Sequence, residues 1–339
     1  MNDENNPPTV STAKVSCLTT HATDAVMNSI LGNGWEDIII PRRIVPPNGY
    51  PSPKMWWAQW AMKISYPTLV GRSFAQYDSP ERKRDTDMFS YTEQKLRGTD
   101  GPTFFLSNEL IDALDRTDVE NAMPMEELRF PHEAMLFVLP TSRRFAEING
   151  VFGSNSYVTM FTISQMDHVK YGKSYIVTFV DCEGVTSHAH YPCQGTYESQ
   201  MSEFGRDFYC STNDAFEAFK REFGVEVSPS QLEADKWQNG MVVRMAWKIL
   251  CAMNCTNDIV RVGGGVCREA RTKKGKTRPA LWNPIILDLG ERIRTEGGDS
   301  SGAGVKLHWR RGHFRRQVCG VGRSQRKTMW IKPHKVGSL

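Results

Sequence analysis

The segment His308–Arg316, with the sequence HWRRGHFRR, combines residue types that bind and cleave phosphate esters. Guanidinium groups bind phosphate through paired hydrogen bonds, and imidazoles are the most frequent general acids and bases. His308 and His313 are therefore candidate catalytic residues for metal-independent cleavage of RNA. The candidate phosphate-binding residues in the segment are Arg310, Arg311, Arg315 and Arg316.

The spacing of the two histidines decides whether they can act together. Side chains alternate between the two faces of a strand, so His308 and His313 point to opposite faces if the strand is uninterrupted. A β-bulge at Gly312 would place them on the same face. Phosphate binding is the preferred interpretation of the segment. Catalysis and a structural network inside the protein are the two alternatives.

Charge is distributed unevenly along the chain. The net charge is +4, but residues 258–339 contain nineteen Lys and Arg against six Asp and Glu. This part is therefore +13 and the remainder is −9. A basic C-terminal quarter beside an acidic body predicts an RNA-binding surface, with a solvated basic tail as the alternative. Further candidate nucleic-acid contacts, including an aromatic ring for base stacking, are Arg323, Arg326, Lys327 and Trp330.

The cysteines do not form a recognisable metal motif. Cys251 and Cys255 are four residues apart, and Cys267 follows twelve residues later. A structural zinc site needs four ligands, and Arg244 and Lys248 on the same helical face would repel a cation. We therefore expect buried thiols, no metal and no cofactor. The chain also contains no P-loop, dinucleotide-binding, hydrolase or kinase motif, which leaves enzymatic activity an open question.

The composition is that of a folded cytoplasmic protein. The chain has 339 residues, with nine Trp, sixteen Phe and ten Tyr, which is enough aromatic surface to exclude wholesale disorder. No apolar run is long enough to span a membrane, and the polar start MNDENNPPTV does not resemble a signal peptide. We expect a cytoplasmic location and no membrane partner.

The pattern along the chain predicts an α+β fold with a Trp-rich helical N-terminal region, a central antiparallel sheet and a basic C-terminal α/β-hairpin module. The expected divisions are a disordered N-terminus over 1–15, a mainly helical region over 16–124, an antiparallel β region over 125–210, and a helical segment followed by the basic module over 211–339.

Local signals predict the individual elements. Helices are expected over 24–31, within the Trp-rich stretch 53–67, over 211–224, from Ser228 onward, and over 283–298. Ser228, Pro229 and Gln231 have the N-cap, N1 and N3 pattern of a capping box. Strands are expected in 130–140, 154–164 and 173–184, and in 305–320 and 327–337. The Gly- and Lys-rich stretch 262–283 is expected to be a loop.

The C-terminal motifs resemble the type V-A anti-CRISPR family of phages and plasmids. The resemblance is good over roughly 240–339 and faint over 125–185. It rests on a helix with an IGER-like end, a His-x-Arg-Arg-Gly-His-aromatic core, a Gly-rich turn and a basic strand with an aromatic residue. These motifs fall on Leu289–Arg292, His308–Phe314, Gly320–Gly322 and Arg326–Trp330.

The resemblance implies a regulator that acts in the cytoplasm of a host bacterium. Members of the family lower the expression of a Cas effector by recognising its nascent chain. The implied partners are a host CRISPR effector polypeptide and either RNA or a ribosome–nascent chain complex, and the implied outcome is loss of the effector's message. The alternatives are a ribonuclease that uses His308 and His313, and a protein-interaction module that binds no nucleic acid.

Overall fold

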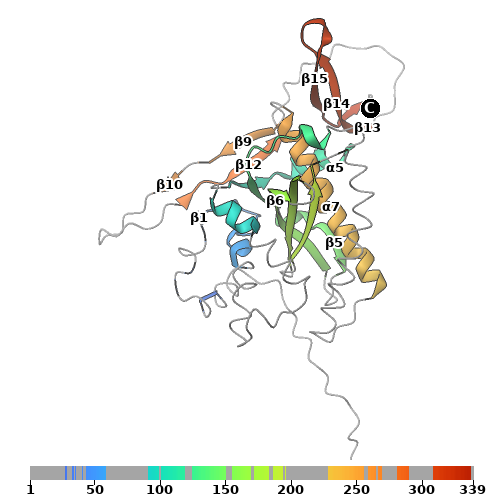
Figure 1. Cartoon of the computed structure of the whole chain (residues 1–339). Helices are drawn as coiled ribbons and strands as arrows, with labels where there is room; N and C mark the ends of the chain where they lie inside the picture. The colour runs from blue at the N-terminus through green and yellow to red at the C-terminus, as the bar shows by residue number, and fades with distance from the viewer. Residues whose placement is uncertain are drawn as a thin grey trace, which may run out of the picture.

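The computed structural model describes the chain in segments. The described residues are 27–28, 33, 35, 40, 43–58, 91–98, 101–118, 124–149, 155–168, 172–182, 186–193, 195, 228–255, 259–264, 266–268, 281–289 and 308–336. The expected disordered N-terminus over 1–15 and the expected helix over 211–224 lie outside these residues, as does most of the expected helix over 24–31. Figure 1 shows the elements along the chain.

An eight-stranded sheet forms the centre of the molecule. Its strand order is β8-β7-β6-β4-β2-β12-β9, and β5 pairs with β6 beside this path. The bounds are β2 Thr103–Leu106, β4 Ala134–Val138, β5 Phe145–Asn149, β6 Asn155–His168, β7 Gly172–Asp181, β8 Thr186–Pro192, β9 Ile259–Gly263 and β12 Ile285–Leu289. The predicted antiparallel pairing of the segments 154–164 and 173–184 is confirmed by the pair β6–β7.

The structure contains both helices and sheets, as the predicted α+β class requires, but the central sheet is mixed and not antiparallel as expected. Strand β2 runs parallel to both β4 and β12, whereas the other neighbours are antiparallel. Parallel neighbours require long connections, because the chain must return to the same end of the sheet. Strands from all three expected regions beyond residue 15 therefore join one sheet, which crosses the divisions expected at 124/125 and 210/211.

The segment 283–298 contains a strand where we expected a helix. Ile285–Leu289 forms β12, which lies between β2 and β9, and Leu287 is fully buried. The expected loop over 262–283 is also partly strand. Its ends contribute β10 Val266–Arg268 and β11 Leu281–Trp282, which pair with each other, and β11 pairs with β1 Arg43–Ile44.

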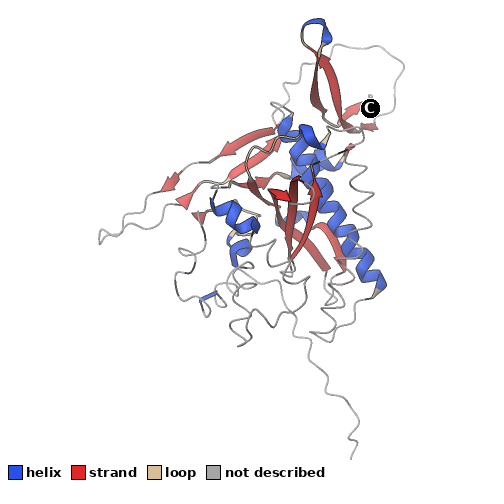
Figure 2. Cartoon of the chain, viewed as in Figure 1, coloured by secondary structure: helices blue, strands red, loops and turns tan. Residues whose placement is uncertain are grey.

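Two helices cover one face of the sheet. Helix α7, Pro229–Asn254, packs along β5, β6, β7 and β8, and helix α5, Asn108–Asp115, packs against α7 and β12 (Figure 2). Ser228 caps α7 as predicted, because its hydroxyl accepts a hydrogen bond from the backbone N–H of Gln231 at 3.2 Å. The buried residues of this face include Phe104, Phe137 and Trp247.

The Trp-rich N-terminal stretch covers the opposite face. Trp56 and Trp57 lie in a short helix over 54–58 and are 0% and 5% exposed, so these two residues belong to the core; residues 59–67 of the stretch lie outside the described part of the chain. They pack with Phe105 and Leu136, which alternate along their strands with the residues of the other face. Both faces of the sheet therefore carry buried core residues. The C-terminal strands β13 His308–Arg310, β14 Gly312–Cys319, β15 Gln325–Ile331 and β16 His334–Val336 lie outside it.

Candidate functional site

The basic module ends in a two-stranded hairpin. Strand β14, Gly312–Cys319, pairs antiparallel with β15, Gln325–Ile331, and the connection contains the short 3-10 helix η4, Val321–Arg323. Gly320 and Gly322 have φ values of 81° and 65°, which glycine adopts without steric cost. The hairpin projects beyond the sheet and its helices (Figure 1). The two predicted C-terminal strands and their turn are therefore confirmed.

The register divides the hairpin into two faces. Residues opposite each other in an antiparallel pair share a face, and successive residues alternate between faces. The inner face is formed by Phe314, Arg316, Val318, Arg326, Thr328 and Trp330. The outer face is formed by His313, Arg315, Gln317, Cys319, Gln325, Lys327, Met329 and Ile331. The predicted phosphate contacts are thus distributed over both faces.

The aromatic pair at the base of the inner face belongs to the core. Phe314 and Trp330 are 2% and 3% exposed, and their rings stack with centroids 5.9 Å apart. The indole Nε1 of Trp330 donates a hydrogen bond to the hydroxyl of Thr117 at 3.0 Å. The ring of Trp330 is therefore covered, and the expectation that it stacks on bases is corrected: it attaches the hairpin to the body.

Close packing at Gly312 fixes where the hairpin begins. Its N–H donates to the carbonyl of Arg116 at 2.9 Å, and it pairs with Thr117 of the short strand β3, Thr117–Asp118. A Cβ at Gly312 would lie 2.6 Å from the Thr117 hydroxyl and 2.9 Å from the Ile331 carbonyl oxygen. The β-bulge that would place His308 and His313 on one face is not formed, since the register runs from Arg310 opposite His334 to His313 opposite Ile331 with the same number of residues on each strand. Glycine is needed there because neighbouring atoms leave no room for a side chain.

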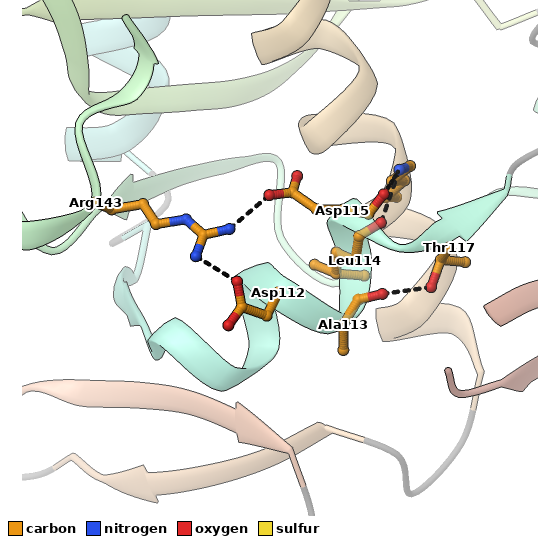
Figure 3. A network of polar contacts seen from close by, with 7 residues as sticks. Asp112, Ala113, Leu114, Asp115, Thr117 and Arg143 are labelled. Atoms are coloured by element: carbon orange, nitrogen blue, oxygen red, sulfur yellow. Dashed lines mark hydrogen bonds and ion pairs between the residues drawn. The ribbon is translucent and has the colours of Figure 1, made fainter. Parts of the chain in front are cut away.

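The C-terminal end of helix α5 holds the attachment point. Arg143 donates to the carboxylates of Asp112 and Asp115, with 2.6 Å to Asp115 (Figure 3). Lys248 of α7 donates from its Nζ to the Leu114 carbonyl at 2.7 Å and to the Asp115 carbonyl at 3.3 Å. A cation at this position complements the negative end of the helix dipole.

Burial has a measurable electrostatic consequence at Lys248. Its side chain is buried, and this desolvation lowers its pKa to about 8 despite the nearby carboxylates of Asp115 and Asp118. Arg244 and Arg311 lower the pKa further. The lysine that we expected to repel a metal ion is therefore a structural cation between α7 and the end of α5.

The predicted phosphate-binding residues differ in their exposure and in whether another side chain of the protein already binds them. Arg316 donates to Glu127 at 2.5 Å, and Arg311 donates to Asp118 at 3.3 Å. Arg315 donates to the amide oxygen of Gln317 at 3.1 Å and remains exposed. Among the residues that the structure describes, Arg323, Arg326 and Lys327 are exposed and have no carboxylate partner, and Arg310 is exposed on β13, His308–Arg310.

The two histidines lie on different strand pairs. His308 begins β13, which pairs with β16, His334–Val336, so that its backbone lies opposite Val336. His313 is in β14, opposite Ile331 and beside Asp118 of β3. The side chain of His313 is half-buried, and that of His308 lies outside the described residues. The backbone alone therefore does not bring them into one site.

The helical cysteines are buried as predicted. Cys251 is completely buried and Cys255 is 3% exposed, and burial raises the pKa of the Cys251 thiol. The side chain of Cys267 lies outside the described residues. Within the described part of the chain, no three His, Cys, Asp or Glu side chains gather as a metal site would require. The described helices include none that is both long and apolar enough to span a membrane.

Sequence reasoning missed the acidic and hydroxyl partners of the module. Thr117, Asp118 and Glu127 lie about two hundred residues before the hairpin and carry no local motif. The sequence signal for Asp118 and Glu127 is the acidic excess of the body, and Thr117 has none. The alternation of Thr328 and Trp330 along a strand did contain a signal for a shared buried face.

Comparison with known proteins shows the family to which the chain belongs. No curated protein and no solved structure matches the chain. The profile of the AcrVA2-like family, described as "Anti-CRISPR type V subtype A2 family", matches residues 104–338. The match extends from strand β2 through helix α7 to strand β16, so it includes the central sheet as well as the basic hairpin. The chain therefore belongs to the type V subtype A2 anti-CRISPR family.

Proposed function

We propose that the chain lowers expression of a CRISPR effector through an RNA-linked mechanism in the cytoplasm of the host bacterium. Membership of the family supports an anti-CRISPR function and implies interaction with a CRISPR effector. In the proposal, the chain recognises the effector polypeptide during its synthesis and uses the β14–β15 hairpin to bind the message or the ribosomal RNA beside it.

One observation carries the proposal: the hairpin is a projecting element whose charge is all of one sign. Residues 300–339 contain ten Lys and Arg and no Asp or Glu. The hairpin cations Arg315, Arg323, Arg326 and Lys327 are exposed, whereas the acidic partners Asp118 and Glu127 pair with other arginines, Arg311 just before the hairpin and Arg316 in β14. A concentration of cations of this kind attracts polyphosphate and releases its counterions.

The experiment is recovery of the tagged full chain from cells that are translating the effector, with sequencing of the RNA that is retained. The variant Arg323→Glu/Arg326→Glu/Lys327→Glu reverses three exposed charges without touching the buried base of the hairpin. Lys173→Glu is the control, because Lys173 is exposed on β7, in the central sheet.

The expected result is that the effector's message is enriched with the native chain and with the Lys173 control, and that the triple variant loses both the RNA and the reduction of effector expression. Retention of the same RNA by the triple variant would show that the hairpin is not the RNA-binding element. Recovery of the effector polypeptide without RNA would favour the interaction module that binds no nucleic acid.

A further inference from the structure

The available cations of the hairpin surround it instead of lining one side. Arg315 and Lys327 are on the outer face, Arg326 is on the inner face, and Arg323 is in the turn at the tip. A flat phosphate surface or a single strand laid along the hairpin would contact one face and leave the opposite cation in solvent. Phosphates on two sides are needed to contact all four residues at once.

A groove of a nucleic-acid double helix supplies phosphates on two sides. The strands β14 and β15 have 8 and 7 residues, and at about 3.3 Å per residue the hairpin is about 25 Å long. Two-stranded ribbons of this kind enter grooves of double helices. The distribution of charge therefore fits a ribbon that lies between two phosphate backbones.

The hairpin exposes no Phe, Tyr or Trp ring to unpaired bases. Proteins that bind single strands stack the bases on exposed aromatic rings. In the hairpin, Phe314 and Trp330 are both buried. The large apolar side chains that the hairpin does expose are aliphatic: Val318 is 39% exposed, Met329 37% and Val321 97%.

The position of Val321 agrees with entry into a groove by the tip. It is almost fully exposed at the turn, between Gly320 and Gly322, whose lack of side chains permits close approach of the backbone. Apolar side chains of groove-binding proteins contact base edges or wedge between base steps in the minor groove. The minor groove of A-form RNA is wide and shallow, and its 2′-hydroxyl groups distinguish it from DNA.

From these observations we infer that the β14–β15 hairpin binds the minor groove of double-helical RNA, with Val321 at the groove floor and the cations of its two faces on opposite phosphate backbones. The inference rests on the proposed function, since it specifies the kind of RNA that the same hairpin binds. It predicts selectivity for a stem over an unpaired strand.

The test measures binding of the purified full chain to three labelled probes of matched sequence over a range of salt concentrations. The probes are an RNA stem of about 16 base pairs, which spans two successive minor grooves, one unpaired strand of that RNA, and the DNA duplex. We expect the RNA stem to bind at least about tenfold more tightly than either other probe. Both faces should contribute to the salt dependence of stem binding.

Variants test separately how the two faces and the tip of the hairpin contribute to RNA binding. Arg315→Ala/Lys327→Ala should lower the slope of log affinity against log salt by about two, and Arg326→Ala by about one. Val321→Ala should weaken stem binding without changing the slope, because no charge is removed. Lys173→Ala, which removes a charge on the central sheet, should change neither the affinity nor the slope.

The possible results distinguish this inference from the proposed function. Equal binding of the stem and the single strand, or an unchanged slope for Arg326→Ala, would overturn the groove assignment while leaving RNA binding intact. Equal binding of the DNA duplex would show that phosphate geometry and not the RNA groove is recognised, which also overturns it. Failure to bind any RNA probe would instead contradict the proposed function itself.

Discussion

The indole Nε1 of Trp330 donates a hydrogen bond of 3.0 Å to the hydroxyl of Thr117, a residue 213 positions earlier in the chain. The Thr117 hydroxyl in turn donates to the carbonyl of Ala113 in the last turn of α5 at 2.6 Å. A basic hairpin near the C-terminus is thus attached to the end of a helix in the first third of the chain. This attachment fixes the direction in which the exposed cations project from the body.

Replacing Thr117 by Val should loosen this attachment. The variant leaves the buried Nε1 of Trp330 without its acceptor, which costs about 1–3 kcal/mol. We expect faster amide hydrogen exchange in residues 312–331, measured by mass spectrometry, and a lower free energy of unfolding in urea.

A double-mutant cycle with Trp330→Phe isolates the hydrogen bond. In the Trp330→Phe background the donor is already absent, so Thr117→Val should cost about 1 kcal/mol less than in the native chain. Strict additivity of the two changes would contradict the hydrogen bond.

Gly312 and Gly240 form a matched pair for testing close approach. A Cβ at Gly312 would lie 2.6 Å from the Thr117 hydroxyl and 2.7 Å from Cδ of Pro333, whereas a Cβ at Gly240 in α7 meets nothing within 4 Å. Gly312→Ala should therefore destabilise the protein by roughly 1–3 kcal/mol through overpacking.

Gly240→Ala should have the opposite sign, because alanine in a helix interior is more stable than glycine by roughly 0.5–1 kcal/mol. Urea denaturation of the two variants provides the comparison. A Gly312→Ala variant as stable as the native chain would show that the strands separate at little cost.

The elements that were predicted correctly have local signals. The start of α7 at Ser228 is specified by three neighbouring residues, and the strands β6 and β7 are long, rich in β-branched and aromatic residues, and adjacent in sequence. The buried state of Trp56 and Trp57 agrees with the expectation that a Trp-rich stretch is more often core than a ligand-binding surface.

The elements that were predicted wrongly depend on distant partners. The sequence IILDLGERI has helix-compatible spacing, but its strand β12 is stabilised by pairing with β2 and β9, and Ile285 lies opposite Phe104. Residues so far apart in sequence leave no local pattern, so tertiary pairing overrides the local preference. The same reason explains Trp330, which lies in a basic segment between Lys327 and Lys332 but whose hydrogen-bond partner is the distant Thr117.

Lys248 should give the stability of the protein a specific dependence on alkaline pH. Its pKa is lowered to about 8 by burial, from an ordinary value of 10.5. Between these values the unfolded chain binds the proton that the folded chain has released, so the free energy of unfolding rises with pH across this window. Below about pH 8 the cost of burying the ammonium is fully present.

Comparison with Lys248→Met isolates this effect from other groups that titrate. The native chain should gain on the order of 1–3 kcal/mol relative to the variant between about pH 8 and pH 10.5. The measurement is urea denaturation of both proteins at several pH values. A difference between the two proteins that does not change with pH would mean that Lys248 is solvated in the folded state.

Asp235 of α7 should behave in the opposite sense at acidic pH. Burial raises its pKa to about 6, and the charge of Asp181 raises it further, while a hydrogen bond from Gln231 acts in the other direction. Between its ordinary pKa of 3.8 and about 6, the folded chain retains a proton that the unfolded chain has lost. The stability contributed by this group therefore falls as the pH rises through this window.

Asp235→Asn removes this penalty, because the amide is uncharged at every pH. The variant should be more stable than the native chain at neutral pH, by on the order of 1 kcal/mol after allowance for partial solvent screening. The gain should disappear below about pH 4, where the native carboxyl is protonated in both states. Thermal unfolding at both pH values provides the measurement, and an equal gain at both would point to packing as the cause.

The final prediction concerns the two histidines. General acid–base cleavage of RNA requires both imidazoles to reach one phosphodiester, yet His308 and His313 belong to different strand pairs, and the half-buried His313 lies at the base of the hairpin opposite Ile331. We expect the purified chain to leave a labelled RNA stem intact in EDTA.

We also expect His308→Ala and His313→Ala to retain the salt dependence of RNA binding while reducing the loss of the effector's message in cells, because the imidazoles orient the neighbouring arginines or the RNA. In that case a host nuclease degrades the message. Adding cell extract to the purified chain and the message should then produce the RNA degradation that the purified chain alone does not. Cleavage of the stem by the purified chain in EDTA, slowed about 10²–10⁴-fold by His313→Ala, would instead identify the chain as the ribonuclease.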